Sequence, residues 1–360
     1  MAEPLKNLYN PSFFEKLIAD FQTVEPHFNA KLFKELIFNE EWESMELKTR
    51  LRHITQTLHE VVNLPYREAL TLFKPIAAKQ KQGFEFMFFP DFVELYGLDD
   101  WEASMDALEH FTQFSSSEFA IRPFIIKDPE RAMKQMFEWS AHPNEHVRRL
   151  ASEGCRPRLP WAMALPKFKR DPAPILPVLE NLKTDPSLYV RRSVANNLND
   201  IAKDHPDWVA KMAESWYGNH PDTDWIVKHA CRTLLKQGRP EVLRIFGFGD
   251  AANILVGNLQ THTSSIAIGE DLHFSFEMVS SEKGSAKLRL EYAIFYLKAN
   301  ASHSKKIFQI TENHFEPGKR AFKRKQSFQN MTTRKHYPGQ HFLAIVVNGV
   351  EKSRVEFMVK

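Results

Sequence analysis

Cysteine is almost absent from this sequence. Only Cys155 and Cys231 occur among 360 residues, and each lies in a segment with helical spacing. Two thiols cannot build the disulfide framework of a small secreted domain, so we expect both to be buried and reduced. A metal-ligand pattern is missing as well: His142 and His146 are four residues apart, but Pro143 breaks the helix that would align them. We therefore predict neither a metal site nor a cofactor.

Long hydrophobic runs are also missing. No stretch reaches the roughly 20 apolar residues that a membrane-spanning helix needs. The first ten residues, MAEPLKNLYN, lack both the basic and the apolar region of a signal peptide. With 43% hydrophobic side chains, the chain can bury the cores of two domains. We expect a monomeric, cytoplasmic protein with no membrane partner.

Acidic and basic residues are unevenly distributed along the chain. Residues 1–120 contain 11 Lys and Arg against 20 Asp and Glu, a net charge of −9, whereas the whole chain carries +3. Residues 121–360 therefore carry +12. A polyanion such as DNA would bind to this basic part of the chain.

Residues 1–245 have the apolar spacing of short helices. Leu51, Ile54, Leu58 and Val62 recur at intervals of three or four, which is typical of one buried helical face. Further along, HPNEHVRRLASEG is matched 43 residues later by DPSLYVRRSVANNL, and HPDTDWIVKHACRTLL is a looser third copy. A period near 40 with a Pro-bearing turn is typical of a HEAT-like α-solenoid.

The repeats leave two functions open. Arg148 and Arg191 follow the repeated valine, and Lys228 takes their place in the third copy. In a scaffold, such a residue forms an ion pair with an acidic residue of the next repeat and so stabilises the stacking of the two repeats. In a DNA-binding protein, stacked repeats would bring the three cations onto one surface along the phosphates. A non-catalytic scaffold that binds DNA or an acidic protein is therefore the alternative to an enzyme.

Residues 246–360 change to the alternation of strands. Segments such as LHFSFEMV, AKLRLEYAIFYL and HFLAIVVNG alternate apolar and polar residues between turns rich in Gly, Asn, Ser and Pro. Five or more strands in about 110 residues predict an antiparallel, immunoglobulin-like β-sandwich. The predicted fold is thus mostly α, a HEAT-like helical domain over residues 1–245 followed by a β-sandwich domain over residues 246–360.

Three carboxylates and a tryptophan stand among the cations of the repeats. Glu118 lies in SSSEFAIRPF, Glu153 and Trp161 lie in ASEGCRPRLPW, and Asp200 lies in VANNLNDIAKDHP. Carboxylates repel phosphates, so their presence on a surface predicted to bind DNA calls for a chemical role. The cations around them that we expect to bind DNA are Arg122, Arg148, Arg149, Arg156, Arg158, Arg191, Arg192 and Lys228.

Base removal would supply that chemical role. A base alkylated on a ring nitrogen is cationic and leaves readily, and positive charge then develops on the sugar. A carboxylate beside the sugar stabilises this charge and positions water. The face of an indole such as Trp161 can hold a cationic base through a cation–π contact, which a neutral base does not gain.

Each of these residues also has a purely structural interpretation. Glu118 would cap the helix that follows the serines before it. Asp200 would pair with Arg191 or Arg192, and Trp161 would be part of the core beneath a Pro-rich turn. The residues alone leave both interpretations open.

The chain resembles one family through five motifs, EFAIRPF, ASEGCRPRLPW, VRRSVANNLNDIAKDHP, HACRTLLKQGRPEVLRIFGF and TTRKHYPGQHFLAIVVNG. They are similar to the AlkC group of the HEAT-like DNA alkylation repair glycosylases, which is related to the AlkD group. The similarity spans nearly the whole chain, and ASEGCRPRLPW is its most specific part. The resemblance implies a monofunctional glycosylase acting on cationic bases in double-stranded DNA, such as 3-methyladenine, 3-methylcytosine and 1-methyladenine.

The resemblance also implies roles for individual residues. Asp200 would be the catalytic carboxylate, Glu118 and Glu153 would support it, and Trp161 would contact the base or sugar. The AlkD group frames its aspartate with two tryptophans, and only Trp161 has a clear place here. No lysine in these motifs is an obvious nucleophile, so we expect water to attack and the DNA strand to stay intact.

A basic segment of the β domain is expected to clamp the DNA. No acidic residue occurs between Pro317 and Lys335. A second domain that holds the duplex would offset part of the cost of bending it, on the order of a few kcal/mol. The alternative is a solvated strand edge whose charges prevent aggregation. The residues expected to bind DNA are Lys319, Arg320, Lys323, Arg324, Arg334, Lys335 and His336.

Overall fold

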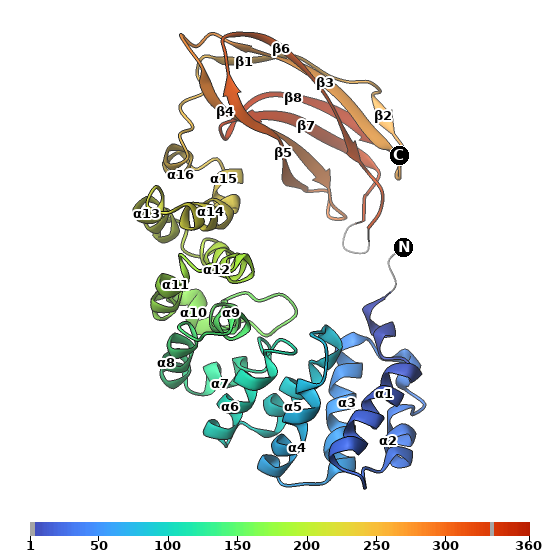
Figure 1. Cartoon of the computed structure of the whole chain (residues 1–360). Helices are drawn as coiled ribbons and strands as arrows, with labels where there is room; N and C mark the ends of the chain where they lie inside the picture. Colours follow the sequence, from blue (N-terminus) through green and yellow to red (C-terminus); the bar gives the residue numbers. More distant parts are fainter. Residues whose placement is uncertain (1–3, 332–334) are drawn as a thin grey trace. The chain divides into compact units, whose positions relative to one another are not determined.

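The computed structural model describes residues 4–331 and 335–360, in which helices come first and strands follow (Figure 1). The helices are α1 Pro11–Val24, α2 Ala30–Ile37, α3 Leu47–Val62, α4 Tyr66–Ala78, α5 Phe88–Tyr96, α6 Trp101–Phe111, α7 Arg122–Lys127, α8 Pro129–Trp139, α9 Glu145–Gly154, α10 Pro166–Arg170, α11 Leu176–Leu182, α12 Leu188–Ile201, α13 Pro206–Trp216, α14 Pro221–Ala230, α15 Arg232–Lys236 and α16 Pro240–Ile245. The strands are β1 Ile254–Thr261, β2 Ser265–Ile266, β3 Asp271–Ser280, β4 Ala286–Leu297, β5 His303–Phe315, β6 Gly318–Ser327, β7 Gly339–Val347 and β8 Val350–Val359. None of the described helices is long and apolar enough to cross a membrane.

The chain divides into two compact units that are not contiguous in sequence. The first, the helical unit, runs to Asp204 and takes in Asn219–Ala230. The second, the β unit, contains His205–Gly218 and Cys231–Lys360, so α13, α15 and α16 belong with the strands. The change from helix to strand falls between Ile245 and Ile254, close to the expected domain boundary. The boundary between the two compact units, however, lies earlier in the chain, because three helices before this point belong to the β unit.

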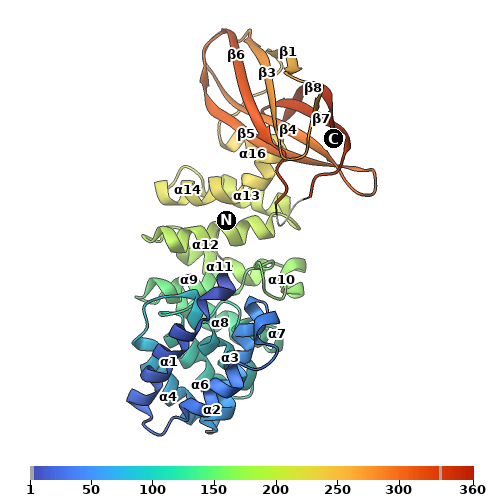
Figure 2. The same cartoon turned by 90° about the vertical axis from the view of Figure 1, so that its right-hand side faces the viewer.

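The helical unit is a stack of short helices, as both views show (Figure 1, Figure 2). Turns with asparagine or aspartate begin many of the helices: the side chain of Asn144, for example, accepts from the backbone at the start of α9, which satisfies an otherwise unpaired N–H group. Val147 in α9 and Val190 in α12 are both fully buried. The helices α9 and α12 pack on each other, linked by a 2.6 Å hydrogen bond between the hydroxyls of Ser152 and Ser193. This arrangement confirms the predicted helical repeats.

The β unit contains a sandwich of two sheets. One sheet has the strand order β1-β3-β6, and the other has the order β2-β8-β7-β4-β5. Alternate residues of β3 and β4, such as Phe274, Phe276, Leu290 and Ile294, are fully buried in the core between the sheets, as strand geometry requires. Among the described residues, all strand pairs are antiparallel except the short parallel pair of β2 with β8, so the predicted antiparallel sandwich is confirmed. The strand β6 lies at the edge of its sheet.

Two glycine turns explain why the last helices belong with the strands. Gly238 lies between α15 and α16, Gly349 joins β7 to β8, and both have positive φ angles, 71° and 79°. A Cβ atom added to Gly238 would lie only 2.7 Å from the Cα atom of Gly349. Such a close approach of two backbones requires glycine at both positions. The helical turn and the strand turn therefore pack directly against each other.

Both cysteines are buried and free of disulfides, as expected. His142 and His146, the pair considered as metal ligands, make other contacts: the ring of His142 accepts from the backbone of Asn144, and the ring of His146 bonds Gln82. Within residues 4–331 and 335–360, no group of three His, Cys, Asp or Glu side chains is arranged to hold a metal ion.

Candidate active site

The three predicted carboxylates are joined by arginines within the helical unit. Arg149 of α9 donates to Glu118 in the turn before α7, and its Nη2 lies 3.3 Å from Oε1 of Glu153. Arg156, just beyond the end of α9, donates from Nη1 to Glu153 Oε1 at 2.6 Å and from Nε to Asp200 Oδ2 at 2.9 Å. The packing of α9 on α12 thus brings together side chains that are up to 82 positions apart, from Glu118 to Asp200.

A lysine completes this arrangement. Lys203 Nζ lies 2.9 Å from Asp200 Oδ1. The cations and the carboxylates are equal in number, so the buried charges compensate one another, as burial of charge requires. The charge network, as we call this set, consists of Glu118, Arg149, Glu153, Arg156, Asp200 and Lys203.

Apart from Lys203, whose side chain is 44% exposed, the network is largely shielded from water, and its arginines keep their charges. Burial by itself would lower the pKa of Arg149, but the attraction of Glu118 and Glu153 outweighs burial and raises it. The pKa of Arg156 is raised in the same way by Glu153 and Asp200, against the effect of burial. Both arginines therefore stay cationic, and the carboxylates keep fixed partners.

The three carboxylates differ in how much of each is left for a ligand. Both oxygens of Asp200 accept from cations, and its side chain is 3% exposed. Glu153 receives Arg149 and Arg156 on Oε1, and no donor among the described residues bonds its Oε2. Glu118 accepts through Oε2 from Ser116 and Arg149, and its side chain is the most exposed of the three at 14%. The geometry thus leaves oxygens of Glu153 and Glu118 open and favours them over Asp200 for direct contact with a ligand.

The structural interpretations of these carboxylates are not the ones found. Glu118 accepts from Ser116 and Arg149 and not from the first turn of α7. Asp200 pairs with Arg156 and Lys203 and not with Arg191 or Arg192. Each carboxylate keeps one partner close in sequence, Ser116 for Glu118 and Lys203 for Asp200, but the arginine partners, Arg149 and Arg156, are 31 and 44 positions away and are set by the packing of helices.

Trp161 is a surface residue and not part of the core. Its side chain is the second most exposed among the large hydrophobic residues of the described chain, with a relative exposure of 62%. The backbone at Trp161 has a φ of 65°, a left-handed conformation that is uncommon for any residue other than glycine. The indole makes an edge contact with the ring of Phe84, with 6.3 Å between the centroids. Most of the indole surface therefore remains accessible.

Arg122 is a correction to the predicted DNA contacts. Its relative exposure is 0%, and burial lowers its pKa to about 10. The guanidinium donates to three backbone carbonyls, those of Gly154 at 2.8 Å, Arg156 at 2.9 Å and Met163 at 2.7 Å. A side chain enclosed in this way cannot reach a phosphate. Arg122 instead holds the segment that carries Trp161.

Arg148 and Arg191 use their charges inside the protein. Arg148 donates to both carboxylate oxygens of Asp185, at 2.6 and 3.2 Å, and to the carbonyls of His142 and Pro143. Arg191 repeats this pattern one helical pair later: it donates to the carbonyls of Asp185 and Pro186 and pairs with Asp222 at 3.3 Å. This geometry favours the role that ties one repeat to the next over the expected phosphate contact.

The other predicted cations of the helical unit are more accessible. Arg192 and Lys228 are exposed. Arg158 is 36% exposed and forms a two-bond pair with Asp204, at 2.6 and 2.9 Å. Arg149 and Arg156 belong to the charge network, so a contact with DNA would have to be made at the edge of that network.

The cations of β6 lie on an edge strand, and two of them are paired. Lys319 lies 2.7 Å from Glu277, and Lys325 lies 2.7 Å from Asp271, both across the ladder with β3. Between them Lys323 is exposed and lies opposite Ser275. The position of the strand fits both interpretations left open by the sequence, the DNA clamp and the protected edge.

The remaining cations of the β unit differ from one another. Arg324 is exposed, and Arg320 is partly covered by the ring of Phe315, 5.3 Å from its guanidinium carbon. Lys335 is exposed, and Arg334 lies outside the described residues. His336 is 6% exposed and packs against the rings of Phe328 and Tyr296, so the prediction that it contacts DNA is wrong.

Three contributors to the site were missed by the sequence analysis: Lys203 of the charge network, Tyr189 and Lys48. Tyr189 lies with its ring 5.1 Å from the guanidinium carbon of Arg149, at the repeat position that His146 occupies one copy earlier. Lys48 reaches the carbonyl of Trp161 with its Nζ at 2.6 Å. The repeat could have indicated Tyr189, but no pattern in the sequence connects Lys48 to a residue 113 positions away.

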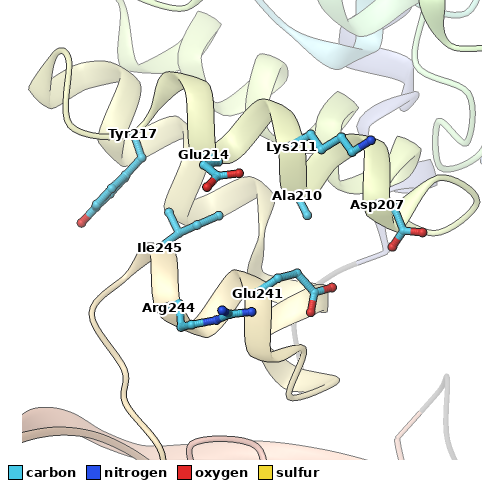
Figure 3. Close-up of a pocket in the computed structure, with 8 residues that line it drawn as sticks. All are labelled: Asp207, Ala210, Lys211, Glu214, Tyr217, Glu241, Arg244 and Ile245. Atoms are coloured by element: carbon cyan, nitrogen blue, oxygen red, sulfur yellow. The ribbon is translucent and has the colours of Figure 1, made fainter.

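The β unit contains a separate groove between α13 and α16, drawn in Figure 3. Its volume is about 780 Å³, and its lining mixes acidic, basic and apolar side chains. None of the residues predicted to form the catalytic or DNA-binding site lines it. The lining residues are Asp207, Ala210, Lys211, Glu214, Tyr217, Glu241, Arg244 and Ile245.

Fold and site together define the class of protein. Residues 37–234 match the family described as DNA alkylation repair enzyme, and the chain belongs to that family. Residues 255–360 match the family described as "Uncharacterised protein YhaZ, C-terminal Ig-like domain", so the predicted immunoglobulin-like character of the sandwich is confirmed.

Individual relatives cover almost the whole chain. The chain is 48% identical over 356 residues to the YhaZ protein of Bacillus subtilis (strain 168), covering 99% of each chain. It is similar to a solved structure described as Pseudomonas fluorescens alkylpurine DNA glycosylase AlkC bound to DNA containing an abasic site analog, with 39% identity and a TM-score of 0.96. That match covers 99% of this chain and 100% of the other. The resemblance to the AlkC group that the motifs indicated is therefore confirmed.

Proposed function

We propose that this protein is a monofunctional DNA glycosylase that hydrolyses the N-glycosidic bond of cationic alkylated bases in double-stranded DNA. The observation that carries the proposal is the charge network, in which one oxygen of Glu153 and one of Glu118 have no bonded donor among the described residues. The exposed indole of Trp161 contacts Phe84, which lines a cavity together with Ser116, the partner of Glu118. The solved relative named as an alkylpurine DNA glycosylase supports an alkylated purine among the substrates.

The carboxylates would act on the charge that develops as the base leaves. The departing base takes the bonding electron pair and becomes neutral, while the sugar becomes an oxocarbenium-like cation. The open oxygens of Glu153 and Glu118 would stabilise that cation and orient water toward it. Because Arg149 and Arg156 fix both carboxylates beforehand, little reorganisation is needed during the reaction.

The selectivity for a cationic base follows from the same groups. The open carboxylate oxygens and the indole face of Trp161 both attract positive charge. A neutral base gains neither attraction and is also a poorer leaving group. We therefore include 3-methyladenine, 3-methylcytosine and 1-methyladenine among the substrates, because each is cationic at neutral pH.

The β unit would contribute to binding the DNA. Lys323 and Arg324 on β6 are exposed cations on an edge strand, and such side chains suit the sequence-independent recognition of phosphates. We propose that this strand holds the duplex during excision.

The deciding experiment is the release of base from methylated DNA. The purified full chain is incubated with duplex DNA treated with a methylating reagent, and the released bases are separated by chromatography. We expect methylated bases in solution and abasic sites that break only after alkali. The Glu153→Gln variant is the control for contaminating activity. Folded protein that binds this DNA and releases no base would support the scaffold alternative and overturn the proposal.

A further inference from the structure

The segment that carries Trp161 has an unusual backbone that requires support. Trp161 has a φ of 65°, which its side chain disfavours. The segment closes on itself through a bond of 3.1 Å from the Leu165 N–H to the Pro157 carbonyl. Most of the indole is exposed, so packing does little to fix its direction. Its orientation must therefore come from the contacts of the backbone.

Two side chains from earlier helices supply those contacts. Arg122 holds the carbonyl of Met163 at 2.7 Å, on one side of the indole position. Lys48, in the first turn of α3, donates from Nζ to the carbonyl of Trp161 itself at 2.6 Å. Between them they fix two carbonyls of the segment, at positions 161 and 163. Only the bond from Lys48 is made at the residue with the left-handed backbone.

Lys48 also touches the turn that carries the catalytic candidate Glu118. Its ammonium lies 5.3 Å from the centre of the Phe119 ring. Phe119 and Ser116, the partner of Glu118, line a cavity of about 70 Å³ together with Lys48 and Phe84. Phe84 is the residue whose ring contacts the indole. From its place in α3, Lys48 thus contacts both the turn that carries Glu118 and the segment that carries Trp161.

We propose that Lys48 is a positioning residue for excision, which holds the indole of Trp161 in the direction that meets the cationic base. This inference rests on the proposed glycosylase function. The bond is made to a backbone carbonyl, so Lys48 acts through the placement of Trp161 and carries no proton or charge to the substrate. Arginine at position 48 can still donate to that carbonyl, whereas methionine keeps the length of the side chain without a donor.

The test combines single and double variants in single-turnover excision. We expect Lys48→Met to lower the excision rate about tenfold, which corresponds to about 1.4 kcal/mol, with little change in affinity for undamaged DNA. Lys48→Arg should restore much of the rate. In the Trp161→Ala background, Lys48→Met should have no further effect, because the residue it positions is gone.

A matched control is available at Lys127. Its Nζ also donates to a backbone carbonyl, that of Leu98 at 2.8 Å, in a different turn of the helical unit. Lys127→Met should leave the excision rate unchanged. A wild-type rate in Lys48→Met, or full additivity with Trp161→Ala, would overturn the inference.

A second readout does not depend on catalysis. The fluorescence anisotropy of Trp161 is obtained as the difference between each protein and the same protein with Trp161→Phe. We expect lower anisotropy for Trp161 in Lys48→Met than in the parent, because the segment has lost its tether. Unchanged anisotropy would overturn the inference even if the parent protein released no base, whereas lower anisotropy without base release would overturn only the glycosylase function.

Discussion

Two arginines of the helical unit, Arg149 and Arg156, and two cations of the β unit, Lys323 and Arg324, use their charges in opposite ways. In the helical unit, Arg149 and Arg156 are largely buried and bonded to carboxylates. On β6 of the β unit, Lys323 and Arg324 project into solvent. A buried arginine with fixed partners orients other groups and gains little from a phosphate, whereas an exposed cation displaces counterions when it meets DNA. Net charge alone therefore does not identify the residues that bind a polyanion.

The largest effect is expected within the charge network. Glu153→Gln should lower the single-turnover excision rate about 10²- to 10³-fold, as does the loss of one group that stabilises transition-state charge. DNA affinity should hardly change, since Glu153 does not attract phosphate. Asp200→Asn should lower the excision rate less, about tenfold, because Arg156 keeps its bond to Glu153. If Asp200→Asn proved the more damaging, Asp200 and not Glu153 would be the principal carboxylate.

A second prediction concerns the arginines between repeats. Arg148→Ala should lower the free energy of unfolding by about 2 kcal/mol, because it leaves the buried carboxylate of Asp185 without its main partner. The salt dependence of DNA binding should be unchanged. Urea unfolding and binding measured between 50 and about 200 mM salt would check both points. A flatter salt dependence would mean that Arg148 contacts the DNA, which would contradict the distinction between the paired arginines of the helical unit and the exposed cations of β6.

The third prediction addresses the exposed cations. The double variant Lys323→Ala and Arg324→Ala should reduce the slope of log affinity against log salt by about 1.8, the value for two phosphate contacts. Lys305→Ala with Lys306→Ala removes the same charge from β5, at the edge of the other sheet. That control should change the slope much less. Equal changes in both variants would mean that β6 contributes only net charge.

The smallest effect is expected from acidification. Burial lowers the pKa of His341 in the β unit below its ordinary value of 6.5. The unfolded chain therefore takes up the proton first, and stability falls as the pH drops below about 6.5. The part of the loss that comes from His341 should be at most about 1.4 kcal/mol between pH 7.5 and 5.5.

The pH effect can be assigned with two variants. His341→Phe should unfold with a weaker pH dependence than the parent, since Phe328 and Phe357 already surround this position. His273 is exposed, so His273→Gln should keep the dependence of the parent. Thermal unfolding followed by circular dichroism at both pH values would compare them, and identical shifts in all three proteins would exclude His341 as the source.

Repeats and alternation were sufficient to predict the fold. The period of 43 residues places Val147 and Val190 in equivalent buried positions, and alternating apolar residues mark β3 and β4. Local patterns of this kind determine which face of an element is buried. They also indicated the carboxylates and Trp161, because a carboxylate on a basic surface is unusual.

The division of the arginines could not be predicted in the same way. Each repeat contains two adjacent arginines, Arg148 with Arg149 and Arg191 with Arg192, and the sequence does not distinguish the first arginine from the second. Adjacent residues of a helix point in different directions, so Arg148 meets Asp185 whereas Arg149 meets Glu118. Partners such as Asp185 for Arg148 depend on how successive helices pack, over a separation of 37 residues. The burial of Arg122 and the reach of Lys48 to Trp161 likewise depend on tertiary packing.

The contact between the glycine turns at Gly238 and Gly349 limits where the β-sandwich can be joined to another helical domain by recombination. Exchange of the sandwich between genes at the point where helix changes to strand would separate one glycine from the other. The residue that replaced Gly238 in the new helical domain would then also have to be a glycine, because a Cβ atom there would collide with Gly349. Recombination should therefore move the sandwich together with α15 and α16, and a crossover at residue 246 should not be compatible with folding.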